Sequence, residues 1–200
     1  MFARSVQWKK ENNAMNIMIV GVGGQGTLLA SRILGNTVIN EGYDVKVSEV
    51  HGMSQRGGSV VTYVKFGDKV YSPIIDKGEA DIILAFEMLE AYRALPFLKK
   101  GGKMLVNTQK MDPMPVITGA MEYPENILDK LAEKVELIQV DALKYALEAG
   151  NPRAVNVVLI GVMAKNTDIP YEKWVETIKT STPEKFLESN LKAFEIGYNL

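Results

Sequence analysis

Residues 16–50, NIMIVGVGGQGTLLASRILGNTVINEGYDVKVSEV, decide the predicted fold class. The apolar run at 16–20 predicts a buried strand, and a glycine-rich turn occupies residues 21–26. Apolar residues then recur at helical spacing over 27–40, and residues 43–50 are typical of a second strand. An order of strand, turn, helix and strand calls for a right-handed crossover between parallel strands.

The rest of the chain continues this alternation, with one exception at residues 59–72. Alternating apolar residues at 59–66, the pair Gly67-Asp68 and the segment 69–72 predict a β-hairpin. Further strands are predicted at 81–86, 103–107 and 135–140, and further helices at 87–98 and 123–134 and after Asp141, Pro152, Pro170 and Pro183. The prediction is a three-layer α/β/α fold, Rossmann-like, whose mostly parallel sheet is made mixed by the inserted hairpin.

The organisation predicted from the sequence is a single domain over residues 15–200. No repeat, low-complexity segment or long linker interrupts that range. Residues 1–14 are predicted to be a disordered leader, or a mis-called start ahead of Met15.

Composition excludes several classes of function. The chain has 200 residues and a net charge of −1, so nothing indicates a nucleic-acid or anionic-membrane surface. With no cysteine and one histidine, the chain cannot ligate an iron–sulfur cluster through cysteine or build a multi-histidine metal site. No apolar run approaches the roughly 18 residues of a membrane span. The first residues lack the apolar stretch of a signal peptide, so a cytoplasmic location is expected.

The glycine-rich turn is the first candidate site. It fits the pattern G-x-G-x-x-G between a strand and a helix, where glycines let the backbone approach a phosphate and the helix N-terminus offers N–H groups. The candidate residues are Gly21, Gly23, Gly24, Gln25 and Gly26. Glu49, 23 residues after Gly26, stands near the position of a ribose-binding acid in Rossmann sites. The alternative is that the glycines only pack the strand against the helix.

The second candidate site is the polar loop after the second predicted strand, within residues 48–59. It gathers His51, Gln55, Arg56, Gly57, Gly58 and Ser59 beside Glu49. Arg56 suits paired hydrogen bonds to a phosphate or carboxylate, and the two glycines allow close backbone approach. A capped loop, a satisfied His51 and an Arg56–Glu49 ion pair are the alternatives, and we favour a binding or interface role for the loop.

No catalytic residue and no metal ligand is predicted. Glu87, Glu90 and Arg93 stand three apart at helical spacing, which is typical of a solvated, paired helix face. The carboxylates show no pairing that would indicate general acid–base catalysis.

Five stretches carry a resemblance to a known family. They are 16–35 (NIMIVGVGGQGTLLASRILG), 48–60 (SEVHGMSQRGGSV), 71–74 (YSPI), 80–93 (ADIILAFEMLEAYR) and 190–198 (NLKAFEIGY). They resemble the small (beta) subunit of indolepyruvate ferredoxin oxidoreductase. That subunit is the equivalent of the gamma subunit or domain of pyruvate, 2-ketoisovalerate and 2-oxoglutarate ferredoxin oxidoreductases. The turn is shared by all these enzymes, whereas residues 48–60 indicate the indolepyruvate type.

The resemblance implies an enzyme that oxidatively decarboxylates an aryl-pyruvate with thiamine diphosphate, coenzyme A and ferredoxin. It implies that thiamine diphosphate and the iron–sulfur clusters are held by a large alpha subunit, and that ferredoxin is reached through the complex. This chain would complete the active-site cleft and help to receive coenzyme A, at the turn 21–26 and the loop 49–59. The isolated chain is expected to be inactive and, with an interface exposed, to favour a homodimer.

Two other functions remain open from the sequence. The glycine pattern with Glu49 also fits a free-standing nucleotide- or flavin-binding oxidoreductase. Alternatively, the chain is a purely structural partner whose glycine loops pack an interface.

Overall fold

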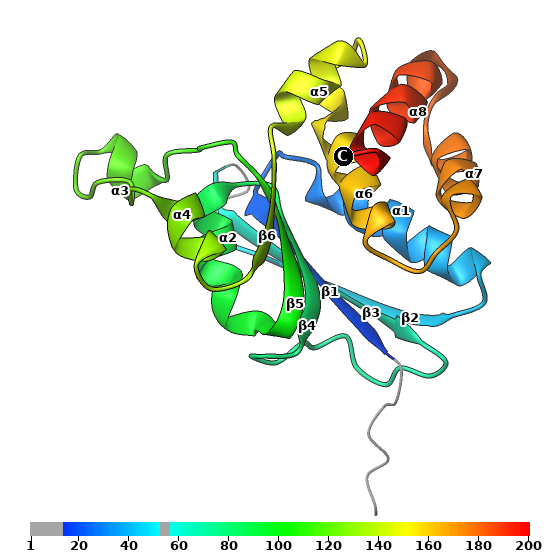
Figure 1. Ribbon diagram of the computed structural model, residues 1–200, viewed down its shortest axis with the longest axis horizontal. Coiled ribbons are helices and arrows are strands. Elements are labelled where there is room, and N and C mark those ends of the chain that lie inside the picture. The colour runs from blue at the N-terminus through cyan, green and yellow to red at the C-terminus, as the bar shows by residue number, and fades with distance from the viewer. Residues whose placement is uncertain (1–13, 53–56) are drawn as a thin grey trace, which may run out of the picture.

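The computed structural model describes residues 14–52 and 57–200, which form a six-stranded sheet between two layers of helices (Figure 1). The strands are β1 (Met15–Val22), β2 (Asp44–His51), β3 (Ser59–Gly67), β4 (Ala80–Ala85), β5 (Leu98–Asn107) and β6 (Glu136–Val140). Their order in the sheet is β2-β3-β1-β4-β5-β6. Strands β1, β4, β5 and β6 pair in parallel, while β3 is antiparallel to both β1 and β2. The predicted α/β class and mixed sheet are confirmed.

Helices cover both faces of the sheet (Figure 1). One face carries α1 (Thr27–Asn40), α5 (Ala142–Glu148), α6 (Val155–Lys165), α7 (Tyr171–Ser181) and α8 (Glu184–Tyr198). The other face carries α2 (Met88–Ala94) and α4 (Ile127–Ala132), and the short α3 (Met114–Ile117) lies in the excursion between β5 and α4. Two 3₁₀ turns, η1 (Leu95–Phe97) and η2 (Pro152–Ala154), precede β5 and α6.

The alternation of side chains along the strands separates the core into two parts. Ile17 and Ile19 of β1 face α1 and α6, where the aromatic ring of Phe194 is fully buried. Met18 and Val20 point to the opposite face, toward α2 and α4. Because successive side chains of a strand point to opposite faces, an apolar run at this position requires helices on both sides.

The predicted hairpin is wrong in its partner. Strand β3 forms as expected, but it pairs with β2 on one edge and β1 on the other, and residues 69–72 are not a strand. Both hydrogen-bonding edges of β3 are thus occupied, which leaves none for the segment after Gly67. That segment is instead held by Asp44, whose side chain accepts a hydrogen bond from the Val70 N–H at 2.9 Å. Strand β3 therefore forms two antiparallel pairs, one with β2 and one with β1, and separates those two strands.

Two glycines lie inside an irregular strand that begins before its predicted start at residue 103. Gly101 and Gly102 lie inside β5, which begins at Leu98, so the predicted helix 87–98 is too long. The pairing of β4 with β5 shifts register between Ala80 and Ile82. A Cβ on Gly102 would lie 2.9 Å from the Asp81 carbonyl oxygen and 3.0 Å from that of Ala80. The close approach of the two backbones requires glycine there.

Several predicted helix starts are confirmed. The carboxylate of Asp141 caps α5 by accepting a hydrogen bond from the Lys144 N–H at 3.1 Å. Pro170 and Pro183 directly precede α7 and α8. The predicted helix 123–134 begins later, at Ile127.

Candidate functional site

The glycine turn connects the carboxyl end of β1 to the start of α1. Gly26 directly precedes the helix with a φ of 89°, and Gly24 has a φ of 101°, a region that only glycine enters freely. Gly21 has a packing role instead, because a Cβ there would lie 2.9–3.0 Å from the side chains of Gln25, Phe86 and Thr27. Of these glycines, Gly24 faces open space.

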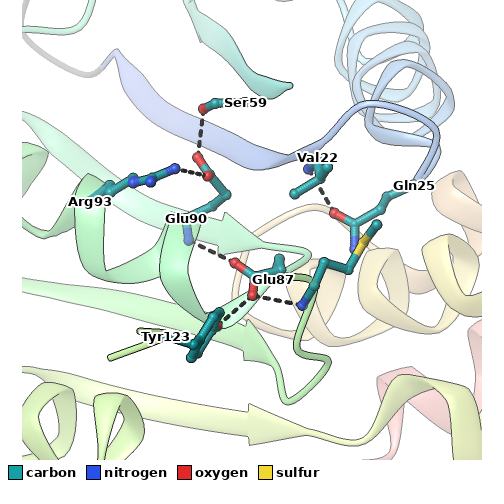
Figure 2. A network of polar contacts seen from close by, with 8 residues as sticks. Val22, Gln25, Ser59, Glu87, Glu90, Arg93 and Tyr123 are labelled. Atoms are coloured by element: carbon teal, nitrogen blue, oxygen red, sulfur yellow. Dashed lines mark hydrogen bonds and ion pairs between the residues drawn. The ribbon is translucent and has the colours of Figure 1, made fainter. Parts of the chain in front are cut away.

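The side chain of Gln25 holds the turn in place. Its Oε1 accepts a hydrogen bond from the Val22 N–H at 2.7 Å (Figure 2). Its Nε2 donates to the Phe86 carbonyl at 3.1 Å and to Gln109 Oε1 at 3.3 Å. The side chain therefore ties the end of β1 to the ends of β4 and β5.

A groove of about 570 Å³ lies between the turn and the start of α6. It is lined by Gly23, Gly24, Gln25, Gly26, Phe86, Gln109, Met111, Pro152, Arg153, Val155 and Asn156. This is the carboxyl edge of the parallel strands β1, β4 and β5, the edge at which open α/β sheets bind ligands. The glycine turn was predicted from the sequence, but Arg153 and Asn156 were not. The neighbouring sequence indicated only that a helix starts after Pro152.

Glu49 does not stand beside the glycine turn. Strand β3 separates its strand from β1, so the neighbouring strands of a Rossmann ribose site are not adjacent here. Its Oε2 accepts a hydrogen bond from Thr62 Oγ1 at 2.9 Å, and its Oε1 lies 2.7 Å from His51 Nε2. Glu49 is also not among the residues that line the groove. These contacts satisfy both carboxylate oxygens and give His51 a structural partner.

The second half of the polar loop contacts the glycine turn. The Gly23 N–H donates to the Gly58 carbonyl at 2.9 Å, so the two candidate segments lie side by side. The Gly52 N–H donates to the Ser59 carbonyl at 3.0 Å and closes the base of the loop. Gln55 and Arg56, together with the neighbouring Met53 and Ser54, lie outside the described residues, and so does the predicted Arg56–Glu49 ion pair.

Ser59 is anchored by a buried carboxylate of α2. Its Oγ donates to Glu90 Oε2 at 2.6 Å, and Glu90 Oε1 lies 2.5 Å from Nη1 of Arg93 (Figure 2). Glu90 retains only 5% exposure, whereas Arg93 is half exposed. The predicted solvated face is therefore wrong for Glu90, which links the end of the polar loop to α2.

Glu87 is buried even more deeply, at 1% exposure. It caps α2 by accepting a hydrogen bond from the Glu90 N–H at 3.0 Å. Its Oε1 also accepts from Tyr123 Oη at 2.5 Å and from the Met111 N–H at 3.1 Å (Figure 2). Burial of the phenol, reinforced by the Glu87 carboxylate, raises the pKa of Tyr123 well above its usual range. Glu87 therefore fastens the excursion after β5, which carries Met111, to α2.

Two kinds of site are not found in residues 14–52 and 57–200. No helix there combines the length and apolarity needed to cross a bilayer. No three histidine or acidic side chains there gather closely enough to hold a metal ion.

Comparison with known proteins identifies the family. The model of the pyruvate ferredoxin/flavodoxin oxidoreductase family matches residues 16–200. The chain belongs to this family. Over 190 residues it is 45% identical to the indolepyruvate oxidoreductase subunit IorB of Thermococcus kodakarensis, covering 91% of this chain and 93% of that protein. The resemblance inferred from the five sequence stretches is confirmed.

Solved structures share the fold. The gamma subunit of a keto/oxoacid ferredoxin oxidoreductase from Geobacter sulfurreducens superposes with a TM-score of 0.69 at 25% identity, covering 92% of this chain and 96% of that one. The 2-oxoglutarate:ferredoxin oxidoreductase of Magnetococcus marinus, solved with 2-oxoglutarate, coenzyme A and succinyl-CoA bound, gives a TM-score of 0.72 at 20% identity. That match covers 94% of this chain and 31% of the larger one, so this fold also occurs as one part of a longer chain.

Proposed function

We propose that the protein is the small subunit of a thiamine-diphosphate-dependent 2-oxoacid:ferredoxin oxidoreductase that acts on indolepyruvate or another aryl-pyruvate. The observation that carries the proposal is the 45% identity to an indolepyruvate oxidoreductase subunit along nearly the whole of both chains. Decarboxylation and electron transfer are assigned to a large partner subunit that holds thiamine diphosphate and the iron–sulfur clusters, and this chain is expected in the cytoplasm. The absence of cysteine from this chain supports that division of labour.

The part proposed for this chain is to complete the active-site cleft and to contact the phosphates of coenzyme A. The glycine turn and Arg56 are the proposed contacts. Support comes from the groove at the carboxyl edge of the parallel strands and from the contact between Gly23 and Gly58, which brings the polar loop to the turn. The Magnetococcus protein, solved with coenzyme A, shares the fold.

Assembly tests the proposed function most directly. The tagged chain should be recovered anaerobically from its native cells and the accompanying proteins identified by mass spectrometry. The expected result is a large, cysteine-rich subunit in the eluate and ferredoxin reduction that depends on an aryl-pyruvate. A chain that elutes alone with a bound nucleotide or flavin would overturn the proposal in favour of a free-standing binding protein.

Arg56 can be tested in the assembled enzyme. Arg56→Ala is expected to raise the KM for coenzyme A while kcat stays near the wild-type value, because a lost phosphate contact weakens ground-state and transition-state binding equally. Arg32→Ala is the matched control, since Arg32 is exposed on α1 and does not line the groove. An unchanged KM in Arg56→Ala would remove Arg56 from the proposed contacts.

A further inference from the structure

Residues 112–122, which contain the short helix α3, form an apolar finger that stands away from the sheet (Figure 1). Three of its side chains are large, apolar and exposed: Met114 at 67%, Ile117 at 66% and Met121 at 65%. The stretch 113–121 has no charged residue. Among the described residues, those that form or line the two apolar cores include none from this finger. Exposed apolar side chains gathered in an uncharged segment indicate an interaction surface.

The base of the finger is held by a single buried carboxylate oxygen. Glu87 Oε1 accepts hydrogen bonds from the Met111 N–H at 3.1 Å and from Tyr123 Oη at 2.5 Å, so it joins the residues on either side of the finger. Within the finger, the Ala120 N–H donates to the Pro115 carbonyl at 2.9 Å. A segment that is ordered before binding loses less conformational entropy when it docks. These contacts fix the finger while its apolar side chains stay uncovered.

The finger belongs to the carboxyl edge of the parallel strands. It follows the end of β5, and α5, which follows the end of β6, exposes Leu143 and Leu147 at the same edge (Figure 1). These two leucines are four residues apart in the helix, so they lie on one face of it. The uncovered apolar surface thus extends along this edge beyond the finger, as expected where a large partner covers it.

Charge and size favour a different protein chain as the occupant. Asp112 and Glu122 stand at the base of the finger, and residues 108–126 carry a net charge of −2, from three acidic residues and one basic. An anionic membrane surface would repel this segment. A stable interface takes roughly 20–30 residues from each side. The finger has 11 residues, so contact between the fingers of two copies would not by itself make a stable dimer.

We propose that the finger is a docking element for the large subunit of the oxidoreductase, and that its three exposed apolar side chains enter an apolar pocket with a basic rim on that subunit. The proposal rests on the proposed function, which supplies this partner. Burial of the three side chains drives the association. The acidic base of the finger matches a rim of opposite charge, which favours the correct partner and orientation.

Anaerobic pull-down of tagged full-length variants from native cells, with the large subunit quantified, tests the finger. Ile117→Glu and Met121→Glu are each expected to recover at least about tenfold less large subunit than the wild type, because each would place a charge in an apolar pocket. Ile117→Leu should recover as much as the wild type, since it keeps the apolar volume. Circular dichroism and the melting temperature show that each variant is folded.

Ile39→Glu is the matched control. Ile39 is 54% exposed, but it lies in the last turn of α1, at the opposite edge of the sheet from the finger. This variant introduces the same charge at a similarly exposed isoleucine and should recover the large subunit as the wild type does.

The outcomes separate this proposal from the proposed function. Full recovery by Ile117→Glu, or an equal loss in Ile39→Glu, would overturn the docking role while the subunit assignment stands. A wild-type chain that elutes alone would overturn the proposed function and, with it, the partner named for the finger. Light scattering on the isolated chain tests a second copy as the occupant. A dimer that Ile117→Glu abolishes, with full recovery of the large subunit, would assign the finger to self-association and overturn the proposal.

Discussion

Gly24 and Gly26 have similar backbone conformations but different surroundings. A methyl group on Gly24 would meet no atom within 4 Å, whereas one on Gly26 would lie 2.8 Å from the amide nitrogen of Asn156. Gly24→Ala is therefore expected to cost about 1–2 kcal/mol in the free energy of unfolding, from backbone strain alone. Gly26→Ala should cost more, because the side chain of Asn156 must also move. Urea denaturation of both variants measures the two losses in the free energy of unfolding. Equal losses in Gly24→Ala and Gly26→Ala would contradict the prediction.

Tyr123 makes the short hydrogen bond to the buried Glu87 carboxylate. Tyr123→Phe removes that donor and is expected to lower the free energy of unfolding by about 1.5–3 kcal/mol, the range for hydrogen bonds to charged groups. Tyr145→Phe is a suitable control, since Tyr145 is half-buried and its phenol has no hydrogen bond to a described residue. If Tyr145→Phe lowered the free energy of unfolding by as much, the hydrogen bond to Glu87 would not be the cause of the loss in Tyr123→Phe.

The same pair of residues predicts a pH dependence. The pKa of Tyr123 is raised in the folded state, so the folded chain holds the phenolic proton more tightly than the unfolded chain does. This contribution to stability is complete below the unfolded pKa of about 10 and is lost as the pH rises toward the folded value. The stability difference between the wild type and Tyr123→Phe should therefore shrink above about pH 10. A difference that grows with pH would contradict the prediction.

At the scale of whole elements, α6 and α8 pack backbone to backbone. A Cβ on Gly161 would overlap the Phe194 carbonyl oxygen, and one on Gly197 would overlap that of Val158. Gly161→Ala and Gly197→Ala are each expected to lower the free energy of unfolding by about 1–3 kcal/mol or more, because the helices must separate. Chemical denaturation is the measurement.

Gly35, within α1, is the matched control for this packing. Its nearest neighbour beyond its own helix would be Val47 Cγ2 at 4.0 Å, so an added methyl group fits. Gly35→Ala is expected to raise the free energy of unfolding by up to about 1 kcal/mol through helix propensity. A loss of stability in all three variants would show that close helix packing is not what distinguishes the other two.

Elements that are indicated by a pattern of neighbouring residues could be predicted from the sequence, whereas the pairing of distant segments could not. The order of strand, glycine turn and helix over β1 and α1 depends on neighbouring residues, so it could be predicted. Gly67-Asp68 has the composition of a tight turn, but β3 pairs with β2 and β1 instead of with the segment after the turn. The residues around position 67 do not indicate that these distant strands occupy both edges of β3.

The same distinction holds for the candidate site. The glycine turn was found because its residues are contiguous. Arg153 and Asn156 come from a segment more than 120 residues further along the chain and reach the groove only because α6 packs beside α1. The burial of Glu87 and Glu90 was missed because helical spacing alone does not tell which face of a helix is covered.

For the whole molecule, the sheet order predicts how local stability is distributed. Strands β1 and β4 are central and buried on both faces, whereas β2 is an edge strand with only partly covered side chains. Amide hydrogen exchange followed by mass spectrometry should therefore be slowest in β1 and β4 and faster in β2. Equal protection of β2 and β4 would contradict this order.

The late position of α6, α7 and α8 in the chain has a consequence for the nascent protein. All six strands are synthesised by Val140, but Trp174 and Phe194, which close one face of the sheet, come later. At about 5–20 residues per second, synthesis of the 60 residues from 141 to 200 takes about 3–12 s. Until α6 has also been synthesised, Ile17 and Ile19 have only α1 over them, so this apolar face is expected to bind ribosome-associated chaperones. A chain truncated before α8 would lack Phe194 and is expected to leave part of this face uncovered.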